Sequence, residues 1–220
     1  MKAAVWRRLV QRYLLPPLPS AWLAGSILVL GEVEWLLQGL VVGTSDFNAA
    51  TIQLSAVNIP LYVPGEGTPG TYGEDLRHPK TGYVWWDVDL VDEELLAQLV
   101  LEATGRQALP FFAGTGTPRE LAAYSERRYP SSINPPVIEI EAYTWALLAE
   151  RKRFAEAFER LERAVASMPP TLTWGRPILE RARTVRQAVK DGPDAAQLLL
   201  GGWRAESIRR LKLEKLVTSS

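Results

Sequence analysis

Thr51-Ile-Gln-Leu-Ser-Ala-Val-Asn-Ile59 decides the fold class of the first half of this 220-residue chain. Apolar residues occupy every second position from Ile52 to Ala56, and polar residues lie between them. This period of two is typical of a β-strand that buries one face. Upstream, Ile27–Leu30 and Leu36–Val42 are further strand-like runs, separated by Gly, Ser, Asp and Asn turns. We therefore expect an antiparallel meander of three or four strands.

A loop rich in glycine and proline follows this meander. Residues 64–82 contain five glycines and three prolines, a density that no regular element tolerates. The loop lies between two strand-like aromatic segments, Asn58–Pro64 and Tyr83–Asp89. Loops of this length without regular structure are uncommon unless they are functional or disordered. The region from residue 64 to residue 86 is therefore our candidate interaction element.

Aromatic and charged residues in and beside the loop form a candidate binding set: Tyr62, His78, Tyr83, Trp85, Trp86, Asp87 and Asp89. On a regular strand, only one of the two adjacent tryptophans can face the core. The other is expected either to anchor a partner or to be covered by the loop. The lone histidine, His78, is expected to be a solvated loop residue rather than a base or a metal ligand.

The acidic pair Asp87 and Asp89 admits two interpretations. Strand alternation places both carboxylates on one face, and paired carboxylates can act as acid and base or bind a hard cation. The simpler interpretation is a half-solvated face of an antiparallel sheet, followed by ordinary acidic capping of the next helix. We expect the second.

Composition excludes several kinds of chemistry. The chain has no cysteine, which rules out disulfides, thiolate nucleophiles and cysteine-ligated zinc. The sequence shows no nucleophile–base pair and no metal-ligand cluster. Gly114–Glu120 lacks the Gly-Lys-Ser/Thr ending of a phosphate loop, and its Thr117, Pro118 and Glu120 instead predict a helix start with a capping box. We therefore expect no catalytic residue, no metal site and no cofactor.

Charge is divided unequally along the chain. Residues 1–110 carry 7 Lys and Arg against 12 Asp and Glu, and residues 111–220 carry 18 against 13. The asymmetry either draws the two halves together or offers an acidic and a basic face to different partners, and internal complementarity is the simpler case. Acids interrupt the arginines of the second half at a spacing of four, as in Glu156 and Arg160. We therefore expect a salt-bridged helical surface and no nucleic-acid binding.

One apolar stretch, Trp22–Val42, invites comparison with a membrane span. Glu32 and Glu34 interrupt it, whereas a spanning helix needs about 20 apolar residues with few charges. Arg7 and Arg8 stand where the apolar region of a secretory signal would develop. We expect no signal peptide, no membrane partner and a cytoplasmic location.

Helical patterns dominate the rest of the chain. Asp92 is expected to cap a helix that stops at Gly105, and residues 108–113 are expected to form an apolar connector. Four more helices are expected after residue 136, the last of them kinked or broken at Gly201-Gly202.

These patterns predict an α+β fold. Residues 1–130 are expected to form an antiparallel β-sheet with flanking helices. Residues 131–220 are expected to form a helical region with a repeat-like hairpin, packed on the sheet. A length of 220 residues exceeds the usual size of one domain. The two regions are therefore expected to be either two separate domains or parts of one large continuous domain.

Small and apolar residues in the second helix of this region follow a known spacing: Phe154, Ala157, Leu161, Ala164 and Pro169. With the preceding helix, they make residues 137–170 resemble a single tetratricopeptide-like helical hairpin. That preceding helix departs from the family pattern at Glu141, Thr144 and Trp145. Since stable repeat arrays need about three units, we expect a repeat-like hairpin and not an array.

The first part of the chain carries a second resemblance. Its motifs are Leu61-Tyr-Val-Pro64, the Trp85-Trp86 strand with the acidic helix after it, and Leu109-Pro-Phe-Phe112. Through them, residues 1–125 resemble a bacterial domain of unknown function found among immunity-like and toxin-neutralising proteins. That resemblance implies no active site.

Three functions follow as hypotheses. The leading one is a non-enzymatic intracellular module, of the immunity or toxin-neutralising kind, that binds a protein partner through residues 64–86. The first alternative is a cation-dependent hydrolase that uses Asp87 and Asp89, with the loop as a lid. The second alternative is a helical scaffold whose basic C-terminal region docks another subunit.

Overall fold

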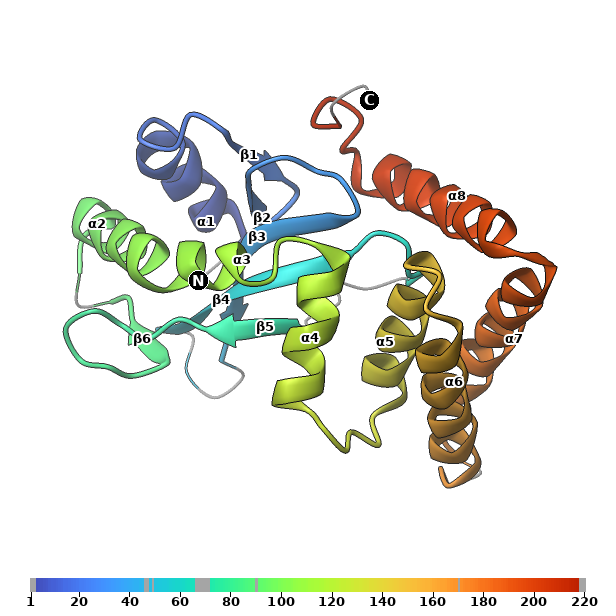
Figure 1. Ribbon diagram of the computed structural model, residues 1–220. Helices are drawn as coiled ribbons and strands as arrows, with labels where there is room; N and C mark the ends of the chain where they lie inside the picture. Colours follow the sequence, from blue (N-terminus) through green and yellow to red (C-terminus); the bar gives the residue numbers. More distant parts are fainter. Residues whose placement is uncertain are drawn as a thin grey trace. The chain divides into compact units, whose positions relative to one another are not determined.

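The computed structural model describes residues 3–45, 48, 50–65, 72–89, 91–169 and 171–217. The protein divides into two compact units. The sheet unit contains residues 1–59, 72–116 and 211–220, and the helical unit contains residues 60–71 and 117–210 (Figure 1). The described chain is α+β, as the sequence predicts, with an antiparallel sheet, flanking helices and a C-terminal helical region.

A six-stranded antiparallel sheet, as far as the structure describes the chain, is the framework of the sheet unit. Its strands are β1 (Ala21–Ala24), β2 (Ile27–Leu30), β3 (Leu36–Thr44), β4 (Thr51–Pro60), β5 (Tyr72–Asp75) and β6 (Trp85–Asp87). They follow the order β1-β2-β3-β4-β5, and β6 also pairs with β4. Since β5 pairs with residues 55–58 and β6 with residues 51–53, these two short strands share one edge of β4. The predicted meander is confirmed, and β1 and β5 are strands that we did not predict from the sequence.

β5 falls within the glycine-rich segment that we expected to be a loop. Tyr72 is buried and pairs with Asn58 of β4. Beside it, Gly73 lies so close to β4 that a Cβ atom would stand 2.8 Å from the Ala56 carbonyl oxygen. Glycine in a strand often marks such a close approach between two backbones. The loop prediction is therefore wrong for residues 72–75, while residues 66–71 lie outside the described residues.

Helices cover the sheet face that carries the alternating apolar residues of β4. α1 (Ala3–Leu9) continues into a π-helical turn, η1 (Val10–Leu14), and α2 (Glu93–Ala103) packs beside them. Their side chains share one core with the strands: Trp6, Leu9, Leu14, Leu96, Val100, Ile52, Leu54 and Trp86. Asp92 caps α2 as predicted, because its carboxylate accepts a hydrogen bond from Leu95 N at 2.7 Å.

The helical run after Asp92 is longer than the sequence indicates. It continues beyond α2 through a π-helical turn, η2 (Thr104–Ala108), into α3 (Leu109–Ala113). The predicted stop at Gly105 and the predicted connector at 108–113 are therefore wrong. Burial overrides the weak helix propensity of glycine, since Ala103, Ala108 and Phe112 all lie in the core.

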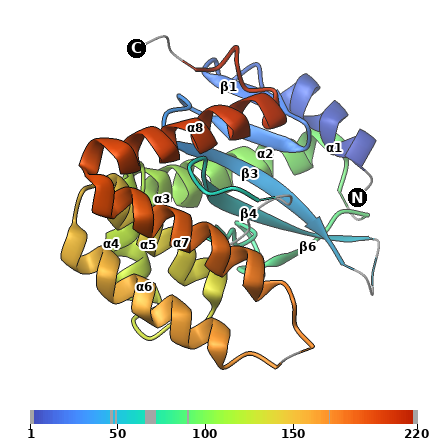
Figure 2. The same cartoon turned by 90° about the vertical axis from the view of Figure 1, so that its right-hand side faces the viewer.

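Five helices carry the helical unit among its described residues: α4 (Pro118–Arg128), α5 (Pro135–Leu147), α6 (Arg151–Ala166), α7 (Gly175–Asp191) and α8 (Pro193–Leu211). α4 starts with the predicted capping box of Thr117 and Glu120. α5 is the central helix: its residues from Val137 to Leu147 are all buried, and it packs against α4, α6 and α7 (Figure 1). Figure 2 shows α7 in front of α5 and α8 running above them in the same unit.

α8 runs unbroken through Gly201-Gly202, so the predicted kink or break there is wrong. Contacts with α5 on both sides of the glycines hold the helix. Trp203 lies against Tyr143 with ring centroids 5.6 Å apart, and Gln197 donates a hydrogen bond to the Leu147 carbonyl. No helix in the described part of the chain combines the length and the apolar composition that a bilayer crossing requires.

Candidate functional site

The candidate binding residues do not all lie in one unit. Tyr62 belongs to the helical unit, where it is fully buried and its hydroxyl lies 2.7 Å from Thr144 Oγ1. Burial raises the pKa of its phenol above the ordinary value, although the bond to Thr144 opposes this. The other six candidates belong to the sheet unit. Tyr62 is therefore placed to stabilise the helical unit, and its predicted binding role has no exposed surface to act through.

His78 and Trp86 stabilise the turn that precedes β6 through hydrogen bonds and a ring contact. Trp86 is buried and donates a hydrogen bond from Nε1 to the Leu76 carbonyl at 3.0 Å. The His78 ring stands edge-on to it at 5.1 Å, and His78 Nδ1 accepts hydrogen bonds from the Lys80 and Thr81 amides. Burial, together with the charge of Lys80, lowers the pKa of His78. An Nδ1 that already accepts two backbone hydrogen bonds fits a structural role in this turn.

Asp87 and Asp89 do not form a pair on one strand face. β6 ends at Asp87, whose carboxylate accepts a hydrogen bond from the Asp89 amide at 3.1 Å. Asp89 therefore lies in a turn, and the predicted alternation is wrong because the strand is too short. No three acidic or histidine side chains of the described residues are placed to hold a metal ion together.

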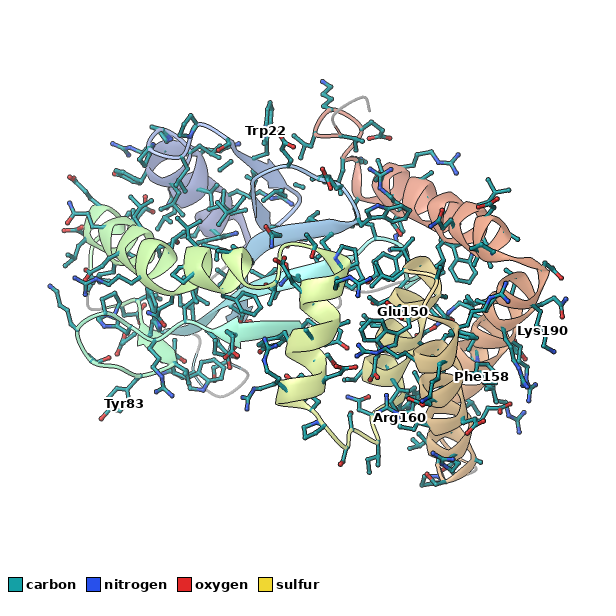
Figure 3. All side chains as sticks on the ribbon, viewed as in Figure 1. Trp22, Tyr83, Glu150, Phe158, Arg160 and Lys190 are labelled. Carbon is teal, nitrogen blue, oxygen red and sulfur yellow. The ribbon has the colours of Figure 1, made fainter. Side chains whose placement is uncertain are left out.

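Tyr83 and Trp85 are the exposed aromatic residues of the predicted interaction element. Tyr83 is 72% exposed and Trp85 is 44% exposed, and Figure 3 shows Tyr83 pointing away from the ribbon. Of the two adjacent tryptophans, Trp86 faces the core and Trp85 faces outward, as strand alternation requires. These two side chains are available to a partner, and their role as an anchor stays a prediction.

A groove of about 360 Å³ lies in the helical unit, and we call it the α4–α6 groove. It is lined by residues of α4, α5, α6 and the segment after α4: Glu126, Tyr129, Pro130, Glu141, Trp145, Arg153, Glu156, Ala157 and Arg160. Its lining combines apolar side chains, such as Pro130 and Trp145, with acidic and basic side chains, such as Glu156 and Arg153. This mixture is typical of a site that orients a ligand through a few polar groups.

The Glu141–Arg160 ion pair is part of the groove lining. Glu141 is buried in the middle of α5, and Arg160 of α6 reaches it with Nη2 2.5 Å from Oε1. A buried carboxylate needs such a partner, because an unpaired charge inside a protein is costly. This ion pair therefore joins α6 to α5, and its Arg160 side chain is labelled in Figure 3.

Trp145 lies one helical turn further along α5 than Glu141. Its side chain is 1% exposed, and the Arg153 guanidinium lies 4.4 Å above its ring. Arg153 is also 3.5 Å from Glu126 of α4, in a pair whose side chains are about half exposed. Arg153 thus lies over the indole ring and also pairs with Glu126.

Two buried N–H donors of the groove lining have no hydrogen-bond partner among the described residues. They are Trp145 Nε1 and Arg160 Nε. Leaving a buried donor unpaired costs about 1–3 kcal/mol, and native proteins leave few such groups without a reason. Both groups can only donate, so the complementary ligand atom is an acceptor oxygen.

Comparison with protein families, with curated proteins and with solved structures gives no significant match for this chain. The two resemblances stated for residues 1–125 and 137–170 therefore stay predictions.

The α4–α6 groove was not among the sites that the sequence suggested. A signal was present, because Glu141, Thr144 and Trp145 are the positions at which the first helix departs from the tetratricopeptide pattern. The structure gives each departure a polar or cationic partner: Arg160, Tyr62 and Arg153, respectively. Nothing in the sequence identified these partners, since they lie on other elements.

Proposed function

We propose that this chain is a protein-interaction module, and that the α4–α6 groove receives a segment of a partner protein. The observation that carries the proposal is the pair of unsatisfied donors, Trp145 Nε1 and Arg160 Nε. Main-chain carbonyl or carboxylate oxygens of a partner supply the acceptors that both groups need. The resemblance of residues 1–125 implies a toxin-neutralising role for this module, and the cytoplasmic location expected from the sequence is part of the same proposal.

Binding begins with the opening of the Arg153–Glu126 pair. An exposed ion pair of this kind contributes about 0–1 kcal/mol, so a ligand can separate the two side chains at little cost. Arg153 then moves off the Trp145 ring and makes the indole accessible to the ligand. The gain is larger than the cost, because each buried donor that finds an acceptor recovers about 1–3 kcal/mol. This difference favours a bound state over the closed groove.

Substitution of Trp145 by phenylalanine tests the proposal, because it removes the N–H donor and keeps an aromatic ring. Proteins captured from a native-host extract are identified, and the affinity of the purified partner is measured by titration calorimetry. We expect Trp145→Phe to weaken binding about tenfold. Trp22→Phe, at an exposed position of the sheet unit (Figure 3), is the matched control and is expected to bind like the unchanged protein. Equal affinity in all three proteins would refute the proposal.

A second variant separates the donor from the ion pair. Arg160→Lys keeps a positive charge for Glu141 and removes the Nε–H group. Partner affinity is expected to fall in this variant, while its urea denaturation midpoint stays close to that of the unchanged chain. A fall in both would assign Arg160 to folding alone.

The exposed aromatic pair is tested in the same assay. Tyr83→Ser with Trp85→Ser removes the predicted anchors of the sheet unit without touching the core, since both side chains are exposed. Loss of binding in this double variant, combined with full binding by Trp145→Phe, would move the contact site from the α4–α6 groove to the sheet unit.

A further inference from the structure

A second groove lies on the other side of α6, between α6 and α7, and we call it the α6–α7 groove. Its volume is about 180 Å³. Phe154, Phe158 and Val189 form its apolar base, and the two phenylalanine rings lie 5.9 Å apart. Phe158 of α6 and Lys190 of α7, both labelled in Figure 3, line this groove. An apolar side chain of moderate size fits such a base.

The rim of this groove is basic. Three cations, Arg151, Arg186 and Lys190, face one acid, Glu159, which leaves a surplus of two positive charges. Arg186 lies over the Phe158 ring at 4.7 Å and is 4.0 Å from Glu162. A pair at that distance between half-exposed side chains contributes little, so it neutralises the rim only weakly.

Arg151 and Lys190 form no ion pair with any described residue. Two of the three rim cations therefore have no carboxylate partner in the part of the chain that the structure describes. Asp191, the acid next in sequence to Lys190, accepts a hydrogen bond from Gln187 and does not line the groove. The rim is thus complementary to a group that brings negative charge from outside.

The start of α6 adds to this positive field. Arg151 is the first residue of the helix, and the N-terminus of an α-helix carries a partial positive charge. Glu150 stands at the N-cap position but makes no capping hydrogen bond, because its carboxylate lies 3.3 Å from Arg119. The helix end therefore stays without a side-chain acceptor and favours an anion beside Arg151.

We propose that the α6–α7 groove binds an acidic segment of a partner protein. An Asp or Glu side chain of that segment pairs with Arg151 and Lys190, and a neighbouring apolar side chain rests on the phenylalanine base. Nucleic acid fits less well, because the acids Glu159 and Glu162 lie among the cations and would repel a phosphate backbone. This proposal shares one premise with the proposed function, namely that the partner is a protein. The groove that it assigns is a different one.

A displayed library of short random peptides, selected against the full chain, tests this proposal. We expect the selected peptides to be rich in Asp and Glu beside apolar residues. The double charge reversal Arg151→Glu with Lys190→Glu is expected to weaken a synthetic peptide from the selection about tenfold or more, measured by titration calorimetry. Higher salt is expected to weaken binding to the unchanged chain. The control is Arg163→Glu with Arg183→Glu, which reverses one exposed charge on each of the same two helices outside the groove.

Several outcomes would overturn the proposal. These are selection of neutral or basic peptides, absence of any enrichment, or an equal loss of affinity in the control variant. If the chain self-associates, and if the charge reversal at Arg151 and Lys190 abolishes this self-association, the groove binds a second copy of the chain instead. Trp145→Phe is expected to leave acidic-peptide binding unchanged. If the peptide result fails while partner affinity still depends on Trp145, this inference falls and the proposed function stands.

Discussion

Replacing Arg181 by methionine leaves Glu139 without its cationic partner inside the helical unit. Glu139 of α5 is 3% exposed, and Arg181 of α7 donates two hydrogen bonds to it, at 3.0 and 3.1 Å. The Tyr143 hydroxyl donates a third, at 2.9 Å. Breaking a buried pair costs about 3–5 kcal/mol. We expect about 3 kcal/mol here, because the Arg181 side chain is 29% exposed and water can partly replace it.

The loss of stability is expected to depend on pH. Burial raises the pKa of Glu139 above its ordinary value of 4.5, although Arg181 and Tyr143 oppose this. A carboxyl with a raised folded-state pKa contributes stability that is complete below the unfolded pKa and is lost as pH rises through the folded pKa. Removal of Arg181 raises that pKa further. Each additional pKa unit adds about 1.4 kcal/mol to the loss at neutral and alkaline pH, whereas at acid pH the protonated side chain is tolerated.

Urea denaturation of Arg181→Met at about pH 5 and about pH 8 measures this difference. The free energy of unfolding is expected to fall by at least about 1 kcal/mol more at the higher pH. Arg183→Met, on the exposed side of the same helix, is the control and should change stability by less than about 0.5 kcal/mol at either pH. Adding Glu139→Gln to Arg181→Met should remove the pH difference. An equal loss at both pH values would refute the reasoning.

Three further substitutions test contacts elsewhere. Thr115→Val removes the acceptor of the 2.7 Å hydrogen bond from Asn58 Nδ2, and should lower the free energy of unfolding in urea by about 1–3 kcal/mol; an unchanged midpoint would contradict this. Tyr62→Phe should cost only about 1 kcal/mol, because Thr144 keeps a bond to the Ile140 carbonyl; a loss several times larger would mean that the hydroxyl does more than bind Thr144. Ala149→Gly should stabilise the protein by about 0.5 kcal/mol, because Ala149 has a left-handed φ of 58°. The strain relieved there exceeds the free-energy cost of the greater unfolded-state entropy of glycine. A lower melting temperature would argue against strain at this turn.

Local patterns predicted most of the elements. The alternation from Ile52 to Ala56 predicted β4, and Asp92 and Thr117 predicted the starts of α2 and α4. Each of these signals is contained within a few neighbouring residues. Strand alternation repeats every two residues, and a helix cap bonds to a backbone amide two or three residues further on. Such signals can be recognised in the sequence without knowledge of the tertiary contacts.

The candidate site was predicted less well. Sequence reasoning selected Tyr83 and Trp85, which are exposed, but also selected Tyr62 and Trp86, which are buried. Aromatic residue type alone does not distinguish an anchor from a core residue. Asp87 was paired with a neighbour on the assumption of a longer strand, and the strand ends at Asp87 itself.

Amino-acid order alone thus specified the α+β class, the strand β4 and the capped helix starts, since these depend on the period and type of adjacent residues. Three-dimensional packing specified that Gly73 belongs to a strand, that α8 passes through its glycines, and that Arg160 pairs with Glu141 rather than with an acid of its own helix. The physical reason is distance along the chain. A close backbone approach or a buried ion pair joins residues on different elements, so its free energy exists only when those elements are assembled. The unsatisfied donors of Trp145 and Arg160 arise from that same assembly.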